Sequence, residues 1–142
     1  MDIFKTKCIK NKSNKMQDFK KIFVKVPQPY LDLINQVFEI EKKASLLKED
    51  NSLQRNINKL KDLIENELFK GNEGAGLTYH NPLGEKYSQS RTDCEASIAG
   101  TETDNLEIVE VIKPIIFYNY IDDNKAIKTI AQKAVIVAEA RN

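Results

Sequence analysis

Residues 29–70 read PYLDLINQVFEIEKKASLLKEDNSLQRNINKLKDLIENELFK, and neither proline nor glycine interrupts the chain between Tyr30 and Gly71. Pro29 suits the first position of a helix, where the missing N–H has no intrahelical partner to lose. Gly71 suits a left-handed C-terminal cap. The stretch therefore predicts one long helix over residues 29–70, roughly 60 Å long at 1.5 Å per residue.

The apolar residues of this stretch form two sets whose spacing alternates between four and three. The two sets are Leu33, Val37, Ile40, Ala44 and Leu47, and then Leu53, Ile57, Leu60 and Ile64. This spacing is typical of a coiled coil, whose apolar stripe is buried against another helix. The step from Leu47 to Leu53 breaks the phase, so we expect an unwinding, a bend or a weak point between them.

A helix of this length needs a partner, and we expect that partner to be a second copy of the chain. The predicted parallel homodimer would pair residues 30–68. Its dimerisation residues would be Leu33, Val37, Ile40, Leu47, Leu53, Ile57, Leu60 and Ile64. The alternative is that the N-terminal segment folds back along the stripe as a second helix. That helix would use Ile3, Phe4, Ile9, Met16, Phe19, Ile22 and Phe23.

The character of the sequence changes after a glycine-rich joint at residues 71–76. Short runs rich in β-branched and aromatic residues follow at 77–80, 94–99, 106–112, 115–121 and 129–138. Asp122 to Lys125 form a turn cluster that predicts a hairpin between the last two runs, and Pro114 predicts a strand break or a corner between sheets. We therefore expect an α+β fold in four parts. They are a basic N-terminal segment (1–28), a long coiled-coil helix (29–70), the joint (71–76) and a small all-β head (77–142).

The charge is unevenly distributed along the chain. The formal net charge is +1, but residues 1–25 hold eight lysines and only two aspartates. This segment contains no arginine, the residue that sequence-specific nucleic-acid binding usually recruits, so we favour a solvated N-terminus over a nucleic-acid-binding arm. No apolar run is long enough to cross a bilayer, and no secretory signal precedes the helix. We expect a cytoplasmic protein whose Cys8 and Cys94 are free thiols.

Few residues suggest catalysis. His80, the only histidine, could activate Cys94, but beside Asn81 and Pro82 it is more typical of a turn. Asp93 and Glu95 could share one strand face, although exposed charges there need no catalytic explanation. The glycines of residues 71–76 do not follow a strand and therefore predict a hinge, not a phosphate loop. We expect no enzyme activity, cofactor or metal site.

Five stretches resemble the GrpE family of nucleotide exchange factors, and the first, residues 76–79, GLTY, resembles the family's short strand entering the head. Residues 81–87, NPLGEKY, resemble that family's loop of the form P-x-G-x-x-F, and residues 94–99, CEASIA, its H-E-A strand. Residues 108–116, IVEVIKPII, resemble the strand V-x-x-V-x-x-x-G-Y, and residues 130–138, IAQKAVIVA, the closing strand I-R-P-A-x-V-x-V-A. Cys94 replaces the family's histidine, Lys113-Pro114 interrupts its G-Y turn, and the predicted helix is shorter than the long helical stalk of the family.

The resemblance implies a dimeric co-chaperone that binds the nucleotide-binding domain of a DnaK-type chaperone and promotes release of ADP. The surface of the head would include Tyr79, His80, Pro82, Tyr87, Lys113, Pro114 and Ile115. Two other classes of function remain open. One is a coiled-coil adaptor or structural interaction module without a chaperone partner, and the other is a nucleic-acid accessory protein that uses the lysine-rich segment.

Overall fold

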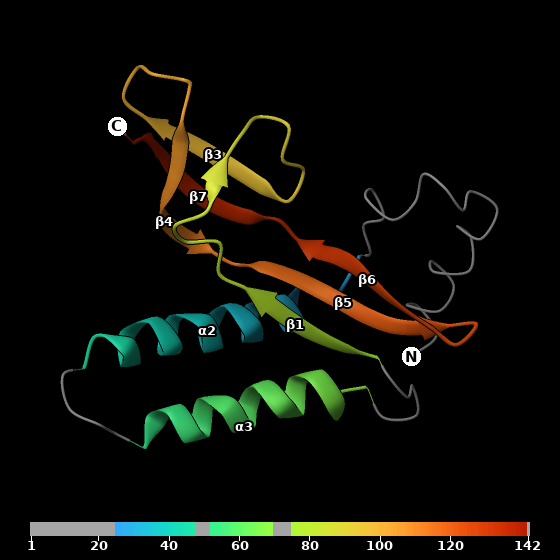
Figure 1. Ribbon diagram of the computed structural model, residues 1–142. Helices are drawn as coiled ribbons and strands as arrows, with labels where there is room; N and C mark the ends of the chain where they lie inside the picture. The colour runs from blue at the N-terminus through green and yellow to red at the C-terminus, as the bar shows by residue number, and fades with distance from the viewer. Residues whose placement is uncertain (1–24, 48–51, 70–74, 142) are drawn as a thin grey trace.

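The computed structural model describes residues 25–47, 52–69 and 75–141 (Figure 1). These residues form two helices, α2 (Gln28–Ser45) and α3 (Leu53–Asn66). The strands that follow are β1 (Gly76–His80), β2 (Lys86–Tyr87), β3 (Cys94–Ala99), β4 (Leu106–Lys113), β5 (Ile115–Asp122), β6 (Lys125–Gln132) and β7 (Ala134–Ala140). The β-prone runs predicted from the sequence are therefore confirmed, with the last run divided between β6 and β7.

One long hairpin connects the two sheets of the molecule. Its first arm is β4 followed by β5, and its second arm is β6 followed by β7; β5 pairs antiparallel with β6, and β4 with β7. The arms turn at Asp123 and Asn124, which both have positive φ angles, 49° and 63°, as a tight hairpin turn requires. The predicted hairpin turn is confirmed.

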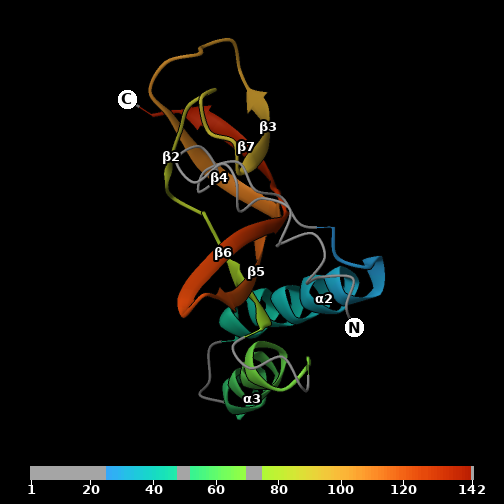
Figure 2. The same cartoon turned by 90° about the vertical axis from the view of Figure 1, so that its right-hand side faces the viewer.

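The long hairpin changes sheets at Pro114 and Lys133. Pro114 has no N–H with which to continue a strand ladder, and its side chain is buried. Beyond this point β1 pairs with β5, which gives a three-stranded sheet of order β1-β5-β6. On the other side the order is β2-β4-β7-β3, with β3 parallel to β7. The predicted corner at Pro114 is confirmed (Figure 2).

The prediction of one long coiled-coil helix over residues 29–70 was wrong. Helix α2 ends at Ser45 and α3 begins at Leu53, so two short helices replace it, and they run side by side in opposite directions (Figure 1). The helices separate at the six-residue step that breaks the apolar phase. Because the chain reverses there, the stripe is partly buried within one chain: Val37 and Ala44 of α2 share a core with Ile57 and Ile64 of α3.

This reversal divides the predicted dimerisation residues into two groups. Val37, Ile57 and Ile64 are buried inside the chain and cannot contact another copy in this fold. The others remain exposed: Leu33, Ile40, Leu47, Leu53 and Leu60. The parallel pairing over residues 30–68 also requires a continuous helix, which the structure does not have.

Two apolar cores hold the helices and sheets together. The first lies between the helices and the three-stranded sheet, where Ile34 of α2 and Ile116 of β5 are fully buried. The second covers one face of the four-stranded sheet and includes Ile108, Ile136 and, from α2, Phe38. Helix α2 therefore contributes to both cores and fixes the two sheets relative to the helix pair.

Three parts of the predicted segments lie outside the described residues. This holds for residues 1–24 of the basic segment, for residues 48–51 between the helices, and for most of the joint at 71–76. Gly76, the last residue of that joint, is the first residue of β1. A Cβ atom at Gly76 would collide with the backbone carbonyl of Glu65 in α3, so this glycine permits the close approach of α3 to β1.

We predict that Gly76→Ala lowers the free energy of unfolding by about 2 kcal/mol or more, because the clash is with backbone and forces α3 away from β1. Urea unfolding followed by circular dichroism measures this change. Gly100→Ala is the matched control, since Gly100 has φ +90° and open space around it, and backbone strain alone costs about 1 kcal/mol. An equal or smaller loss for Gly76→Ala would contradict this close packing.

Candidate protein-binding site

The loop of residues 81–85, NPLGE, is held rigidly against β4. The side chain of Asn81 accepts a hydrogen bond from the N–H of Leu83 at 3.2 Å, and the N–H of Glu85 donates to the carbonyl of Pro82 at 3.1 Å. Gly84 has φ +85°, which glycine adopts without strain. Two bonds of 2.9 Å, from Gly84 N–H to Ile108 C=O and from Ile108 N–H to Glu85 C=O, then join the loop to the strand.

This loop presents one large apolar side chain to solvent. Leu83 is 55% exposed, whereas the neighbouring Pro82 is fully buried and anchors the loop in the core. Because the loop backbone is bonded on both sides of Leu83, little conformational freedom remains to be lost when a partner covers it. Leu83 is therefore a preorganised apolar anchor.

A shallow hollow of about 200 Å³ lies beside Leu83, between α2 and β4. Its wall from α2 consists of Phe38 and Lys42, and its wall from β4 includes Val109 and Glu110. The ammonium group of Lys42 donates to the carbonyl of Val111 at 3.2 Å and lies 5.4 Å from the centre of the Phe38 ring. The hollow thus combines an apolar floor with one cation and one carboxylate at its rim, as protein-binding surfaces commonly do.

A series of charged groups connects the loop of residues 81–85 to the residues around it. Glu85 contacts His80 through one carboxylate oxygen and Arg91 through the other, at 3.1 Å. Arg91 then holds Asp93 with two parallel bonds of 2.9 and 3.0 Å and donates to the carbonyl of Lys86 at 3.0 Å. The two loops on either side of β2 are therefore tied together by one guanidinium group.

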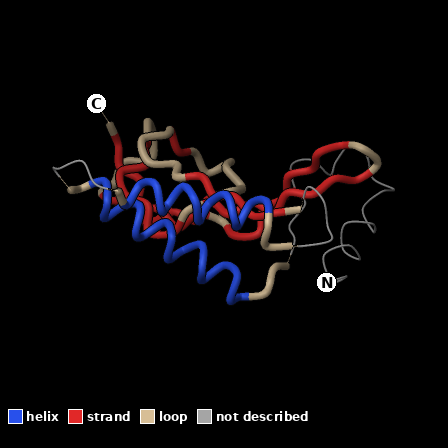
Figure 3. Tube along the Cα trace, turned by 90° about the horizontal axis from the view of Figure 1, so that it is seen from below, coloured by secondary structure: helices blue, strands red, loops and turns tan. Residues whose placement is uncertain are grey.

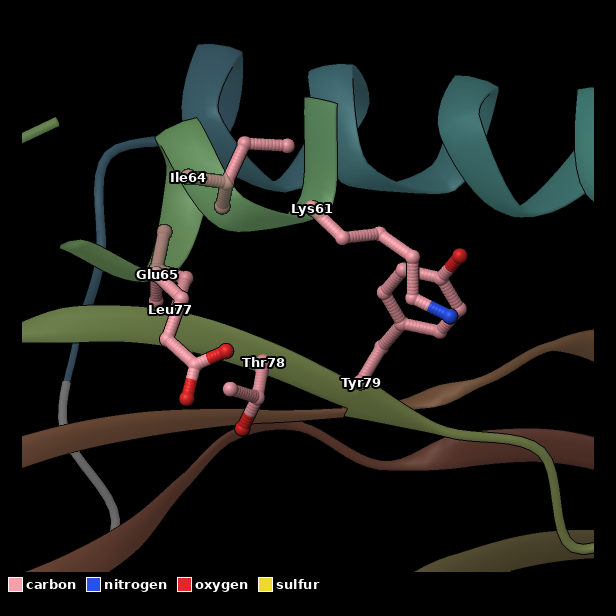
Figure 4. A pocket seen from close by; sticks show the side chains of 6 residues that line it. All are labelled: Lys61, Ile64, Glu65, Leu77, Thr78 and Tyr79. Carbon is pink, nitrogen blue, oxygen red and sulfur yellow. The ribbon is translucent and has the colours of Figure 1, made fainter. Parts of the chain in front are cut away.

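Tyr79 and Glu41 form a second polar cluster, which joins α2, α3 and β1. The Tyr79 hydroxyl donates to Glu41 at 2.9 Å, and Lys61 of α3 pairs with Glu41 at 3.2 Å. The Lys61 ammonium lies over the Tyr79 ring, 4.8 Å from its centre. Both side chains line a pocket of about 180 Å³ (Figure 4). This cluster attaches the helix pair to the sheet.

The pKa values of Tyr79 and Glu41 shift in opposite directions from their usual values. Burial and the nearby Glu41 carboxylate raise the pKa of Tyr79. Burial would also raise the pKa of Glu41, but hydrogen bonds from Tyr79, Lys61 and Gln54 outweigh it and lower that pKa. The phenol therefore stays protonated and the carboxylate ionised near neutral pH, which fits a structural contact.

The seven predicted contact residues do not share one environment. Pro82, Pro114 and Ile115 are buried and support the surface from within, and Tyr79 is committed to Glu41. Tyr87 is half-buried, whereas His80 and Lys113 are exposed. The structure adds two residues at the hollow that the sequence analysis did not select, Lys42 and Leu83. Leu83 could have been selected, because an apolar residue between Pro82 and Gly84 lies at the tip of a turn.

The residues considered for catalysis do not form a reactive centre. Burial and the neighbouring Asp93 carboxylate raise the pKa of Cys94 to about 12, so its thiol is not activated as a nucleophile. His80 contacts Glu85, and Asp93 is held by Arg91. Within residues 25–47, 52–69 and 75–141 no group of three potential metal ligands occurs.

We predict that the Arg91 contacts stabilise the fold in a pH-dependent manner. Hydrogen bonds from Arg91 lower the pKa of Asp93, although burial opposes the shift. A carboxyl group whose pKa is lowered on folding stabilises the fold at pH values above its pKa in the unfolded chain, about 3.9. This stabilisation is lost as the pH falls through the pKa of the folded state. Arg91→Gln should therefore lower the free energy of unfolding by about 1 kcal/mol at pH 7, and by much less near pH 2.5.

Urea unfolding at the two pH values checks this prediction. Arg141→Gln is the matched control, since Arg141 pairs with Glu107 at 2.9 Å but is 59% exposed, and exposed pairs contribute little. A loss for Arg91→Gln that is the same at both pH values would show that Asp93 is not the group responsible.

Neither helix in the described part of the chain has the length and apolar character needed to span a membrane. Comparison of the chain with models of protein families, with curated proteins and with solved structures finds no match.

Proposed function

We propose that the chain is a protein-binding factor that promotes nucleotide exchange on a DnaK-type chaperone, using the loop of residues 81–85 and the adjoining hollow as its contact surface. One observation carries the proposal. Two of the stretches that resemble the GrpE family, residues 81–87 and 108–116, are distant in sequence but joined by the bonds between Gly84, Glu85 and Ile108. Both stretches contribute residues to the hollow that Leu83 lines.

The surface has the properties that a non-enzymatic exchange mechanism needs. Leu83 supplies an exposed apolar anchor, and Lys42 and Glu110 supply charges at the rim, so a partner surface can be recognised by shape and charge together. An exchange factor acts by binding the open state of the nucleotide-binding domain more tightly than the closed state. Each tenfold difference in affinity between the two states requires about 1.4 kcal/mol, and a rigid surface loses little of that energy to ordering.

A second candidate function is an adaptor that uses the same surface for a protein other than a chaperone. The helix pair favours this alternative, because the resemblance includes a long helical stalk and the structure has two short helices in its place. Both candidates predict that a partner covers Leu83. They differ in whether binding accelerates the release of ADP.

We predict that Leu83→Asp abolishes partner binding without unfolding the chain, since Leu83 is exposed and its replacement places a charge at the apolar centre of the contact. The test measures release of fluorescent ADP from the DnaK-type chaperones encoded in the same genome. The wild-type chain should accelerate release at least tenfold, and Leu83→Asp should reduce its affinity about thirtyfold or more, as expected for loss of an anchor.

Ile121→Asp is the matched control, because Ile121 is equally exposed, at 54%, but lies at the turn of the long hairpin. This variant should accelerate release as the wild type does, and both variants should keep the wild-type circular dichroism spectrum. Failure of the wild-type chain to accelerate release from every such chaperone would reject the exchange function. Binding to a chaperone without acceleration would support the adaptor instead.

A further inference from the structure

Strand β3 is an outer strand of the four-stranded sheet, whose order is β2-β4-β7-β3. It pairs in parallel with β7 on one side, and no other described strand pairs with it. In Figures 1 and 2 it lies at the margin of this sheet, at the end of the molecule away from the helix pair. Its second half, Ser97 to Ala99, is exposed. Within the described residues, one edge of β3 is therefore open to solvent.

The other outer strands have the protection that natural sheet edges usually have. β1 lies so close to α3 that a Cβ atom at Gly76 would collide with the backbone of Glu65, and Figure 3 shows, from below, both helices in front of the strands. On β4, Lys42 donates a hydrogen bond to the carbonyl of Val111. β6 carries two lysines. In the described part of the chain, β3 has neither a covering element nor a lysine.

The ladder between β3 and β7 shows which backbone groups point to the open edge. The N–H of Ala134 donates to the carbonyl of Asp93 at 2.9 Å, and Cys94 is in register with Ala134. In a parallel ladder, alternate residues direct both their N–H and their C=O to the same neighbour. Asp93 and every second residue after it therefore face β7. Ale backbone groups of Ala96 and Ile98 point to the open edge, where no described residue bonds them.

We propose that this edge binds an extended, basic segment of a partner protein, which adds to the sheet as a further strand beside β3. Such a strand would bond the N–H and C=O groups of Ala96 and Ile98, and its alternate side chains would provide selectivity. Antiparallel addition is expected, because it is slightly more stable per residue. The proposal does not depend on the exchange function, since β3 contributes no residue to the loop of residues 81–85 or to the hollow.

One face of β3 favours apolar side chains on the partner strand. Ala96 and Ile98 lie on the face that covers the second core, in register with the buried Ile136 and Ala138 of β7. Ile98 is still 36% exposed. Partner residues opposite Ala96 and Ile98 would extend this core, so we expect them to be apolar.

The other face of β3 is acidic. Glu95 lies on it, because successive side chains of a strand alternate between faces. Residues 95–105 also contain Glu102 and Asp104 but no lysine or arginine, and these three carboxylates form no ion pair with a described residue. Lys113, in the same row as Glu95, lies two strands away. Opposite charges on adjacent strands stabilise pairing, so we expect lysine or arginine opposite Glu95.

Fluorescence anisotropy with the full chain tests the proposal. The probe is a labelled peptide of about seven residues in which valine and lysine alternate, and the matched control peptide has glutamate in place of lysine. The lysine peptide should bind with a Kd of about 100 µM or below, and the glutamate peptide about tenfold more weakly or worse. No binding of the lysine peptide at about 1 mM chain would overturn the proposal.

N-methylated peptides test the backbone geometry. In an antiparallel strand, the valines opposite Ala96 and Ile98 direct their N–H groups to β3. Methylation of the valine nitrogens should lower the affinity about tenfold or more, whereas methylation of the lysine nitrogens should change it by less than about threefold. The reverse result would support a parallel strand at the same edge. Equal losses in the two peptides would overturn the proposal.

Two variants of β3 test the protein side of the contact. Ala96→Pro removes an N–H that points away from β7, so it should keep the wild-type circular dichroism spectrum and bind the lysine peptide about tenfold more weakly or worse. Glu95→Lys should weaken the lysine peptide and strengthen the glutamate peptide. Glu67→Lys, an exposed change at the end of α3, is the matched control and should alter neither.

Unchanged binding of the lysine peptide to Ala96→Pro or to Glu95→Lys would overturn the proposal. Sedimentation equilibrium of the wild-type chain tests the other occupant of such an edge. A dimer that Ala96→Pro abolishes would assign the edge to a second copy and would also overturn the proposal.

Discussion

The antiparallel pairing of the long hairpin, from Leu106 to Ala140, is the constraint on which the rest of the structure depends. Both sheets are built on its arms: β1 joins it on β5, while β2 and β3 join it on β4 and β7. Pro114 divides the first arm between the sheets, since it cannot donate to a ladder. Gln132, near the same point, donates to the carbonyl of Pro114 at 3.1 Å and exchanges hydrogen bonds with Asn35 of α2. The corner of the hairpin and the helix pair are thereby held by one amide side chain.

The strands could be predicted because their signals are local. β-branched and aromatic runs, the turn residues Asp123 and Asn124, and the missing N–H of Pro114 each act on their immediate neighbours, and the structure places strands, turn and corner accordingly. The helical region was harder to predict. A heptad stripe indicates that one face of a helix is buried, but it does not identify the element that covers that face. The same residues can pair between two chains or, after a reversal, within one. The loss of phase after Leu47 was visible in the sequence. Its consequence, a reversal of the chain direction, depends on the packing of Val37 and Ala44 against Ile57 and Ile64.

The candidate site shows the same division between local and tertiary information. The turn at residues 81–85 follows from Asn81, Pro82 and Gly84, whose preferences are local. Burial is not local: Pro82, Pro114 and Ile115 belong to the core because the hairpin corner encloses them. Loop position alone therefore selected residues that support the surface along with residues that form it. The hollow also needs Lys42 of α2, which no pattern in the head could have indicated.

Helix α2 connects the candidate site to the rest of the fold. Phe38 and Lys42 line the hollow, and they lie about one turn apart on the same side of the helix. Val37 and Ala44, on another side, share a core with Ile57 and Ile64 of α3. Because one helix carries both pairs of residues, the packing of α2 against α3 also fixes the position of one wall of the hollow. The helix pair therefore supports the candidate contact surface, although it lies outside the head.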